Sequence, residues 1–363
     1  MADRLRVLIV GLGNMGHSHA RAYQRLDTSV ELVGLCSRSI ENQCDIPAAL
    51  GALPRFADYA EALSSLAPDA VCICTWPDTH AEYALAAFEA GAHVFVEKPM
   101  AETVDAARQV ADEARATGRK LVVGYILRHH PAWSRFVEVA HTLGKPLVMR
   151  MNLNQQSSGA SWEVHKHLMR SLSPIVDCGV HYVDVMCLMT RSRPVRVHAV
   201  GARLSDEIDE QMYNYGHLHV TFDDGSVGWY EAGWGPMMSE TAFFVKDVIG
   251  PRGSASIVMQ DHDSAPRRNQ VNSDNMSVHT RTNAIRVHHA KTSASGDFAL
   301  ADDLLSMADE PDHDALCTAE QRYFVRAIEE DLDLEQHVAD AINSLRIVLA
   351  ADEAVRTGEV VAL

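Results

Sequence analysis

Residues 6–16, RVLIVGLGNMG, join a short apolar run to a glycine-rich turn. The apolar run has the length and the composition of a strand that is buried on both faces of a parallel sheet. Three glycines follow in the pattern G-x-G-x-x-G: Gly11 permits a tight turn, Gly13 admits a pyrophosphate, and Gly16 lets a helix pack closely against the strand. Because a helical stretch follows this turn, we predict a dinucleotide site in which the phosphates face the N-terminus of a helix.

Further apolar runs alternate with helical patterns up to residue 125. The predicted strands are residues 31–36, 70–75, 92–97 and 120–125, and the clearest helices are residues 81–90 and 104–118. Strands that alternate with helices form right-handed βαβ units and a doubly wound parallel sheet. The fold class predicted for residues 1–126 is therefore α/β, a Rossmann dinucleotide-binding domain.

After residue 126 the apolar runs become longer and partly alternating. Asp223-Asp224-Gly225 lies between two of these runs and is typical of a hairpin turn. The pattern predicts an α+β domain over residues 127–363, with a large, mostly antiparallel open sheet and helices on one side. Residues 260–312 are polar and are expected to form a long excursion with weak strands. The last two helices are expected to end at Gly358.

The composition restricts the classes of function. A chain of 363 residues is long enough for about two domains. The net charge of −17 argues against nucleic-acid binding, which requires a basic surface. No apolar run has transmembrane length, and the first one is too short for a secretory signal, so we expect a cytoplasmic protein without a membrane partner. The seven cysteines are scattered without a C-x-x-C pair, which indicates buried thiols in a reducing compartment.

The end of the second strand indicates which cofactor binds. Enzymes that bind NAD commonly carry an acidic residue there, which accepts hydrogen bonds from the adenine ribose 2′-hydroxyl. This chain has Ser37, Arg38 and Ser39 instead, and a hydroxyl beside a guanidinium favours the 2′-phosphate of NADP. NADP is therefore the predicted cofactor. In the alternative, Arg38 only stacks on the adenine and NAD binds as well.

Residues 177–184, DCGVHYVD, place Asp177, His181 and Asp184 at positions i, i+4 and i+7 of a predicted helix. Ser173-Pro174 is typical of the start of that helix. The three groups share one helix face, where they could bind a metal, transfer a proton or cap a core. Positions i and i+7 lie about 10 Å apart along the axis, which does not suit ligands of one metal ion. An imidazole that titrates near neutral pH suits proton transfer, so we predict an acid–base site and no metal.

The same helix shows how it is expected to pack. Its apolar stripe consists of Val176, Val180, Val183 and Cys187. Gly179 costs about 1 kcal/mol relative to alanine in a helix interior, which suggests that another group approaches the backbone closely at this position.

The strand over residues 92–97 ends in Glu97-Lys98-Pro99, at the carboxyl edge of the predicted sheet, where ligands of such sheets bind. Together, GLGNMGHSHA (11–20), THAEYALAAFEAGAHVFVEKPM (79–100) and DCGVHYVD resemble the glucose–fructose oxidoreductase and inositol dehydrogenase family, called Gfo/Idh/MocA. The resemblance covers nearly the whole chain and is strongest over residues 5–130 and 173–190. The combination of the three motifs is highly specific, although each one alone is not.

The resemblance implies roles for individual residues. Lys98 would lie beside the reacting carbon, Asp177 and His181 would flank the substrate near the nicotinamide, and the Lys98–Pro99 bond would be cis. These three side chains are the expected catalytic residues. The expected cofactor contacts are Gly11, Gly13, Asn14, Met15, Gly16, Ser37, Arg38, Thr75, Trp76, His80, Glu97 and Lys98. The expected substrate contacts are Lys98, Arg128, His165, His167, Asp177 and His181.

Two segments depart from the pattern of the family. Thr75-Trp76-Pro77 replaces the usual Thr-Pro-Asn, so the polar contact of the asparagine is in doubt and Trp76 is a candidate to close the nicotinamide pocket. VHKHLMRSLSP (164–174) replaces a small, glycine-rich stretch. Within it, His165, Lys166, His167 and Arg170 either contact the substrate or belong to an ordinary solvated loop over residues 154–172.

These observations predict a dehydrogenase or reductase that transfers a hydride between NADP and one carbon of a sugar or polyol. His181 is the expected general base in oxidation and general acid in reduction, Lys98 stabilises the developing alkoxide, and Asp177 orients the substrate. Asp184 is expected to support the helix or to position His181. The alternatives are a non-sugar carbonyl, imine or dihydrodiol as substrate, or a sensor that binds the cofactor without turnover. Members of the family commonly pair through the open sheet face, so we expect a homodimer or a homotetramer.

Overall fold

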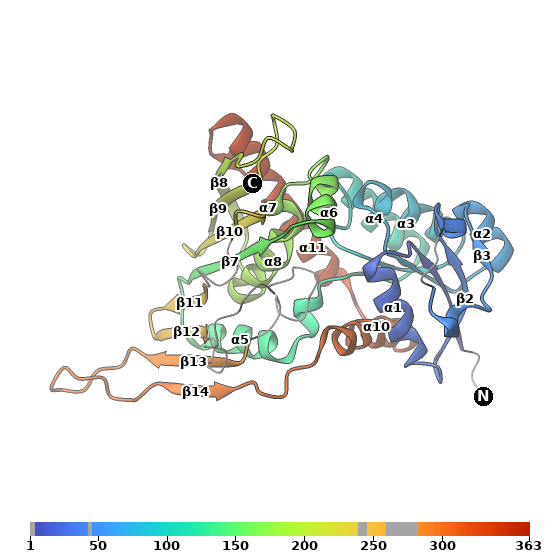
Figure 1. The fold of residues 1–363 in the computed structure, drawn as a ribbon. Helices are drawn as coiled ribbons and strands as arrows, with labels where there is room; N and C mark the ends of the chain where they lie inside the picture. The colour runs from blue at the N-terminus through green and yellow to red at the C-terminus, as the bar shows by residue number, and fades with distance from the viewer. Residues whose placement is uncertain (1–3, 43–45, 239–244, 259–281) are drawn as a thin grey trace. The chain divides into compact units, whose positions relative to one another are not determined.

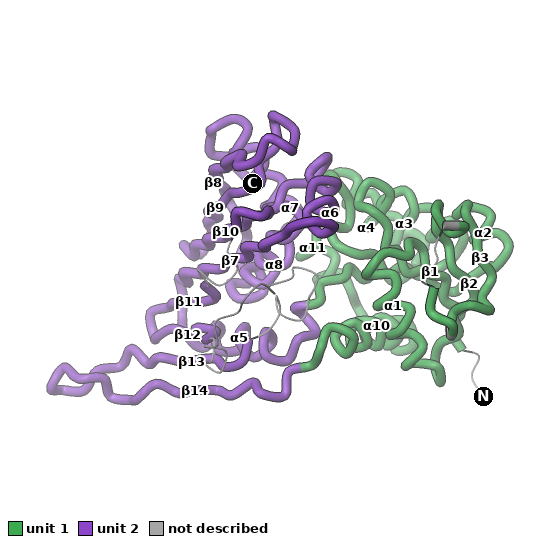
Figure 2. Tube along the Cα trace, viewed as in Figure 1, with its two compact units in different colours: residues 1–126, 311–342 green, residues 127–310, 343–363 purple. Residues whose placement is uncertain are grey.

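The computed structural model describes residues 4–42, 46–238, 245–258 and 282–363. The chain forms two compact units (Figure 2): residues 1–126 with 311–342, and residues 127–310 with 343–363. The first boundary between the two units lies after residue 126, where the pattern of apolar runs in the sequence also changes. Residues 311–342 belong to the first unit, whereas the sequence led us to place the whole of 127–363 in the second domain.

The first unit contains a parallel sheet of six strands (Figure 1). Its strands are β1 (Leu5–Val10), β2 (Val30–Cys36), β3 (Arg55–Phe56), β4 (Ala70–Ile73), β5 (His93–Val96) and β6 (Leu121–Val123). The order β3-β2-β1-β4-β5-β6 reverses direction between β1 and β4, which is the topological switch point of a doubly wound fold. The predicted Rossmann sheet is confirmed, and only the two-residue strand β3 was missed.

Helices connect these strands and cover the sheet. They are α1 (Asn14–Gln24), α2 (Tyr59–Leu66), α3 (His80–Glu89) and α4 (Val104–Thr117), together with α10 (His313–Glu329) and the first part of α11 (Glu335–Thr357). Helix α4 begins where the Thr103 hydroxyl accepts a hydrogen bond from Ala106 N, and it ends at Gly118 with φ +66°. Helix α10 belongs here because its apolar face, with Phe324 and Val325, shares one buried core with Tyr23 of α1 and Phe95 of β5.

The second unit contains a sheet of nine strands in the order β14-β13-β12-β11-β7-β10-β9-β8-β15. The strands are β7 (Val148–Gln156), β8 (Pro194–Ala202), β9 (Tyr215–Phe222), β10 (Val227–Gly235), β11 (Lys246–Gly250), β12 (Gly253–Val258), β13 (Ala284–His289), β14 (Asp303–Ser306) and β15 (Val361–Ala362). Among the strands that the structure describes in this sheet, only β7 and β10 pair in parallel, so the sheet is mostly antiparallel as predicted. Asp223-Asp224-Gly225 forms the turn between β9 and β10, with Gly225 at φ +83°.

Helices of the second unit pack on one face of this sheet. They are α5 (Pro131–Thr142), α6 (Ala160–Leu168), α7 (Pro174–Asp177), α8 (Gly179–Thr190) and the remainder of α11. The opposite face leaves Val148, Val227 and Ile249 exposed. Helix α11 ends before Gly358, which has φ +74°, so the predicted end of the last helix is confirmed. Of the predicted polar excursion, residues 260–281 lie outside the described residues, and the following part forms the β13–β14 hairpin.

Candidate active site

The glycine turn after β1 has the geometry that the motif requires. Gly11 has φ +88°, and a Cβ atom on it would lie 2.5 Å from the Cys74 carbonyl oxygen. A Cβ atom on Gly16 would lie 1.9 Å from the Gly11 carbonyl oxygen. A Cβ atom on Gly13 would meet nothing within 4 Å, so this glycine leaves open space in front of helix α1, which begins at Asn14. The turn therefore fits a pyrophosphate at a helix N-terminus.

The segment after β2 carries hydroxyl groups and a guanidinium. Ser37 N donates a hydrogen bond to Phe56 O at 3.0 Å, and the Ser37 and Ser39 hydroxyl oxygens lie 3.3 Å apart. The Arg38 side chain is exposed. This set carries no carboxylate that would repel a phosphate group on the adenine ribose.

The segment after β4 is tied to the loop after β5 by His80. Its Nδ1 lies 2.7 Å from Pro99 O and its Nε2 lies 3.1 Å from Thr75 O. Burial lowers the pKa of His80, so the ring is neutral at neutral pH, and we assign its single N–H to the shorter contact with Pro99. His80 therefore ties the segment after β4 to Pro99. Trp76, in the same segment, is 41% exposed.

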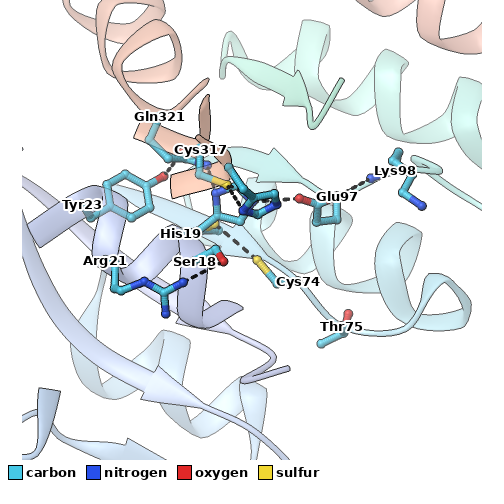
Figure 3. Close-up of polar contacts among 12 residues, drawn as sticks. Ser18, His19, Arg21, Tyr23, Cys74, Thr75, Glu97, Lys98, Cys317 and Gln321 are labelled. Carbon is cyan, nitrogen blue, oxygen red and sulfur yellow. Dashed lines mark hydrogen bonds and ion pairs between the residues drawn. The ribbon is translucent and has the colours of Figure 1, made fainter. Parts of the chain in front are cut away.

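The E-K-P segment lies at the carboxyl end of β5. Glu97 is buried, Lys98 is half-buried, and the Lys98–Pro99 bond is cis, as the resemblance implies. The Lys98 backbone N–H donates to the Glu97 carboxylate at 3.2 Å, and the Lys98 side chain points away from that carboxylate (Figure 3). A Cβ atom on Gly124 would lie 3.2 Å from both Glu97 carboxylate oxygens, so this glycine makes room for the buried acid.

A chain of buried side chains lies behind Glu97 (Figure 3). His19 Nε2 lies 2.8 Å from Glu97 Oε1, and His19 Nδ1 lies 2.8 Å from Gln321 Nε2. The Tyr23 hydroxyl donates to Gln321 Oε1. The sequence analysis missed His19, Tyr23 and Gln321. The available signal was that His19 and Tyr23 share a face of α1 with Gly16, at spacings of three and seven residues.

His19, Cys317 and Glu320 also form a mixed donor set, because their ligand atoms lie within 4.8 Å of one another. Both nitrogens of His19 already take part in hydrogen bonds to Glu97 and Gln321. Burial raises the pKa of the Cys317 thiol, and burial together with the charge of Glu97 raises the pKa of Glu320. A metal ion here would require broken hydrogen bonds and two deprotonations, so the arrangement fits a neutral acid and thiol better than a metal site.

The helix predicted over residues 177–184 is divided in two. Ser173 caps its start, since its hydroxyl accepts from Val176 N at 3.2 Å. Helix α7 ends at Asp177 and α8 begins at Gly179, so the prediction of one continuous helix was wrong. The division occurs at Cys178, whose carbonyl accepts a hydrogen bond from the backbone N–H three residues later, that of His181, at 3.3 Å. The predicted close approach at Gly179 is confirmed, because a Cβ atom there would lie 2.9 Å from the Tyr230 ring.

The three polar side chains of this segment have different surroundings. Asp177 is 9% exposed and His181 is half-buried. Asp184 is buried and accepts two hydrogen bonds from Arg128, from Nε at 2.8 Å and from Nη2 at 2.6 Å. Asp184 therefore supports the helix, as one of the two predictions for it stated. Arg128 is engaged in this ion pair with Asp184. Its expected contact with the substrate stays a prediction.

Residues 160–168, expected in a loop, form helix α6. Its first turn contacts a residue that precedes the helix: the Ser161 hydroxyl donates to Ser158 O at 2.9 Å and accepts from Ser158 N at 3.3 Å. Trp162 and His165 are buried three residues apart on one face of this helix. The loop expectation overlooked that spacing, which is typical of an amphipathic helix.

The candidate substrate residues of this helix are not equivalent. His165 is buried, stacks on Trp234 with ring centroids 4.4 Å apart, and contacts the Ser157 hydroxyl at 2.9 Å. Lys166 forms ion pairs with Glu163 and Glu207. The side chains of His167 and Arg170 are exposed. His167 and Arg170 are thus accessible to a small molecule, whereas His165 is buried, and a substrate contact from this segment stays a prediction.

Two family models match successive parts of the chain. The Gfo/Idh/MocA model described as "Oxidoreductase family, NAD-binding Rossmann fold" matches residues 5–125, and the "GFO/IDH/MocA C-terminal domain" matches residues 139–256. The chain belongs to the Gfo/Idh/MocA oxidoreductase family. Membership agrees with the glycine turn, with the E-K-P segment and with the order of strands in the first sheet.

Two individual relatives share 27% and 30% of the aligned residues with this chain. The scyllo-inositol 2-dehydrogenase (NAD(+)) of Bacillus subtilis is 27% identical over 269 residues, which cover 71% of this chain and 75% of the relative. The 4-carboxy-2-hydroxymuconate-6-semialdehyde dehydrogenase of Sphingobium is 30% identical over 171 residues, 44% of this chain and 54% of the relative. Matches to several curated relatives span only about half of their length, 43% to 54%.

The crystal structure of an oxidoreductase domain protein from Kribbella flavida has a TM-score of 0.78 at 21% identity, and the match covers 99% of both chains. At this level of identity the likeness shows a shared fold alone. Among the helices that the structure describes, none has both the length and the apolar composition needed to cross a membrane.

Proposed function

We propose that this chain is a nicotinamide-dependent dehydrogenase or reductase that acts on one carbon of a sugar or polyol. The observation that carries the proposal lies within the first unit. Strands β1, β4 and β5 are neighbours, and their carboxyl ends carry the glycine turn, Thr75 and the E-K-P lysine. This edge is where doubly wound sheets bind dinucleotides, so Lys98 emerges on the side of the sheet that the nicotinamide would occupy. Relatives named inositol 2-dehydrogenase and D-glucoside 3-dehydrogenase support the substrate class.

The proposed chemistry assigns one task to each of three side chains. A bound nicotinamide would supply the hydride acceptor for oxidation of the alcohol carbon and the hydride donor for reduction of the carbonyl carbon. His181 takes the hydroxyl proton during oxidation and gives it back during reduction, since an imidazole can both accept and donate a proton. The Lys98 ammonium holds the same oxygen and stabilises its developing negative charge. Asp177 accepts a hydrogen bond from a neighbouring hydroxyl and fixes the substrate's orientation.

We further propose that NADP binds more tightly than NAD. The hydroxyl groups of Ser37 and Ser39 and the exposed guanidinium of Arg38 support this preference, since all three groups can donate hydrogen bonds to a 2′-phosphate. The family itself is described by an NAD-binding Rossmann fold. A measured preference for NADP would therefore come from this chain's own residues after β2.

A second copy of the chain is the proposed partner of the open sheet face in the second unit. Val148, Val227 and Ile249 are exposed there, beside a hollow of about 530 Å³ that Arg150, His219 and Trp229 also line. An exposed apolar face on a large sheet is typical of a surface that pairs with another protein. The net charge of −17 supports the expectation that nucleic acid is not a partner. The cysteines that the structure describes are buried, which supports a reducing compartment such as the cytoplasm.

The alternative substrate class is a non-sugar carbonyl, imine or dihydrodiol. The semialdehyde dehydrogenase of Sphingobium, which is similar over less than half of this chain, gives that alternative a specific basis. A sensor without turnover remains the alternative of a different class. It would have no need for the proton-transfer group proposed here.

A substrate screen tests these proposals together. The full chain is incubated with NADP or NAD and with inositols, hexoses, glucosides and aromatic semialdehydes, and reduced nicotinamide is followed by its absorbance. We expect turnover with a polyol or sugar, and turnover that is slower by at least about 10²-fold with Lys98→Met under the same conditions. Turnover with semialdehydes alone would favour the second substrate class. Cofactor binding without turnover on any of these compounds would favour a sensor.

A further inference from the structure

Helix α10 reaches the E-K-P segment through one continuous line of buried hydrogen bonds (Figure 3). Tyr23 contacts Gln321, Gln321 contacts His19, His19 contacts Glu97, and Glu97 accepts the backbone N–H of Lys98. Tyr23, Gln321 and His19 are at most 1% exposed. Water does not compete for these bonds, so each partner restricts the next one strongly.

The donors in this line can be assigned from chemistry. The Tyr23 hydroxyl donates to Gln321 Oε1, which leaves the amide Nε2 facing His19. An amide nitrogen only donates, so His19 Nδ1 is the acceptor and the ring proton is on Nε2. His19 Nε2–H therefore donates to Glu97 Oε1. Gln321 thus selects the tautomer that can hold Glu97.

The charges of the neighbouring acids are consistent with this assignment. Glu320 is 1% exposed, and neither of its carboxyl oxygens has a hydrogen-bond partner among the described residues. Burial, followed by the charge of Glu97, raises the pKa of Glu320, so Glu320 is the neutral acid of the two. The Glu97 carboxyl group faces two donors, His19 and the Lys98 N–H, and a buried carboxylate requires such donors.

We propose that His19 is a positioning residue for Lys98. It holds the Glu97 carboxylate, and that carboxylate fixes the backbone from which the Lys98 ammonium extends. His80 holds the other side of the same loop through Pro99 O. This inference rests on the proposed function, because Lys98 acts on substrate only there. It also gives residues 311–342 a role in the first unit, since α10 supplies Gln321.

Two substitutions of His19 separate the contact with Glu97 from the rest of the side chain. The amide of His19→Gln reaches the place of Nε2 and can still donate to Glu97. The amide of His19→Asn reaches only the place of Nδ1, so it keeps a group facing Gln321 and loses the contact with Glu97. With the substrate found in the screen, His19→Asn should lower kcat by about tenfold to a hundredfold, the range expected for a displaced catalytic group. His19→Gln should recover most of this loss.

Both variants keep the glycine turn and Ser37, so the affinity for cofactor should fall much less than kcat. Equal kcat values for His19→Asn and the native chain would overturn the proposal. Equal losses in His19→Asn and His19→Gln would also overturn it, since they would show that the ring is needed for packing alone.

A double-mutant cycle with Lys98→Met gives the decisive readout. If His19 acts through Lys98, His19→Asn should cause little further loss of kcat in the Lys98→Met background. The same fold-loss in both backgrounds would overturn the proposal in favour of a general structural effect. Full activity of Lys98→Met itself would instead remove the proposed function, so the two failures are distinguishable.

Tyr23→Phe provides a second variant in case His19→Asn does not fold. It removes one hydroxyl that orients Gln321 and leaves the ring packing in place. Its kcat should fall in the native background and stay unchanged in the Lys98→Met background. A normal kcat for Tyr23→Phe, measured beside a His19→Asn chain that does not fold, would count against the proposal.

Discussion

Arg128 and Asp184 form a two-pronged ion pair inside the second unit, with N–O distances of 2.8 and 2.6 Å. The carboxylate is 1% exposed and the guanidinium side chain 13%. The pair joins the 3-10 turn Ile126–His129 to helix α8. It accounts for the last aspartate of D-x-G-x-H-x-x-D as a structural residue, and it leaves Asp177 and His181 as the candidates for chemistry in that motif.

We expect Arg128→Met to destabilise the protein, because it leaves the Asp184 charge buried without its partner. Breaking a buried ion pair by removing one side typically costs about 3–5 kcal/mol. The double variant Arg128→Met, Asp184→Leu should recover part of this loss, since no charge remains buried. Urea unfolding followed by circular dichroism measures both values. A double variant that is as unstable as the sum of the single variants would contradict this account.

The catalytic prediction concerns His181. His181→Ala should lower kcat by about 10²–10⁴-fold, the usual effect of losing a general acid–base group. Lys98→Met should be at least as damaging, and the combined variant should lose far less than the product of the two effects, as expected for residues that act on the same oxygen. Cofactor titration by tryptophan fluorescence should give unchanged affinity for His181→Ala. A native turnover rate for His181→Ala with every accepted substrate would rule out this role.

The glycine turn offers a matched pair of substitutions with opposite expectations. Gly13→Ala places a methyl group in open space, so the melting temperature should be unchanged. The same methyl group would occupy the expected position of the pyrophosphate, and an overpacked contact costs about 1–3 kcal/mol, or roughly five- to hundredfold in Kd. Gly16→Ala should instead prevent stable folding, because its Cβ would lie 1.9 Å from the Gly11 oxygen. Thermal unfolding and cofactor titration distinguish the two, and normal cofactor affinity in Gly13→Ala would contradict the assigned site.

The preference for NADP over NAD is expected to depend on the charge of the side chain at position 37, directly after β2. Ser37→Asp should weaken NADP binding relative to NAD, since the new carboxylate repels the 2′-phosphate. At a separation of 4 Å this repulsion is about 1 kcal/mol per pair of unit charges even with the screening of bulk water, or roughly fivefold in Kd. Ser37→Asn is the uncharged control of the same shape. Tighter binding of NAD than of NADP by the native chain would remove the basis of the prediction.

Glu320 should make stability depend on pH. Its pKa is raised in the folded chain, chiefly by burial and then by the charge of Glu97, so the unfolded chain loses this proton at lower pH than the folded chain. Stability should therefore decrease as the pH rises above the ordinary glutamate value, by up to about 1.4 kcal/mol per pH unit. Glu320→Gln removes the titration, so the stability of this variant relative to the native chain should increase from pH 5 to pH 7. The lower end of this range is about half a pH unit above the ordinary glutamate pKa. Glu329→Gln, at an exposed position of the same helix, should not show this trend.

The sequence by itself determined the features that depend on local periodicity and on backbone conformation. Buried parallel strands appear as short apolar runs, so the first sheet could be predicted apart from Arg55–Phe56. The glycine turn could be predicted because Gly11 and Gly16 occupy positions where any Cβ atom would collide with backbone. The start of helix α7 could be predicted from Ser173, because a capping side chain bonds to backbone that is close to it in the sequence.

Only the tertiary structure decided which distant side chains meet. Gln321 lies 302 positions from His19, and Asp184 lies 56 positions from Arg128. A hydrogen bond between such residues leaves no periodic signal in the sequence, because each partner alone looks like an ordinary polar residue on a helix. The return of residues 311–342 to the first unit escaped prediction for the same reason. An amphipathic helix shows that it has a face to bury, but the surface that covers this face is chosen by packing over the whole fold.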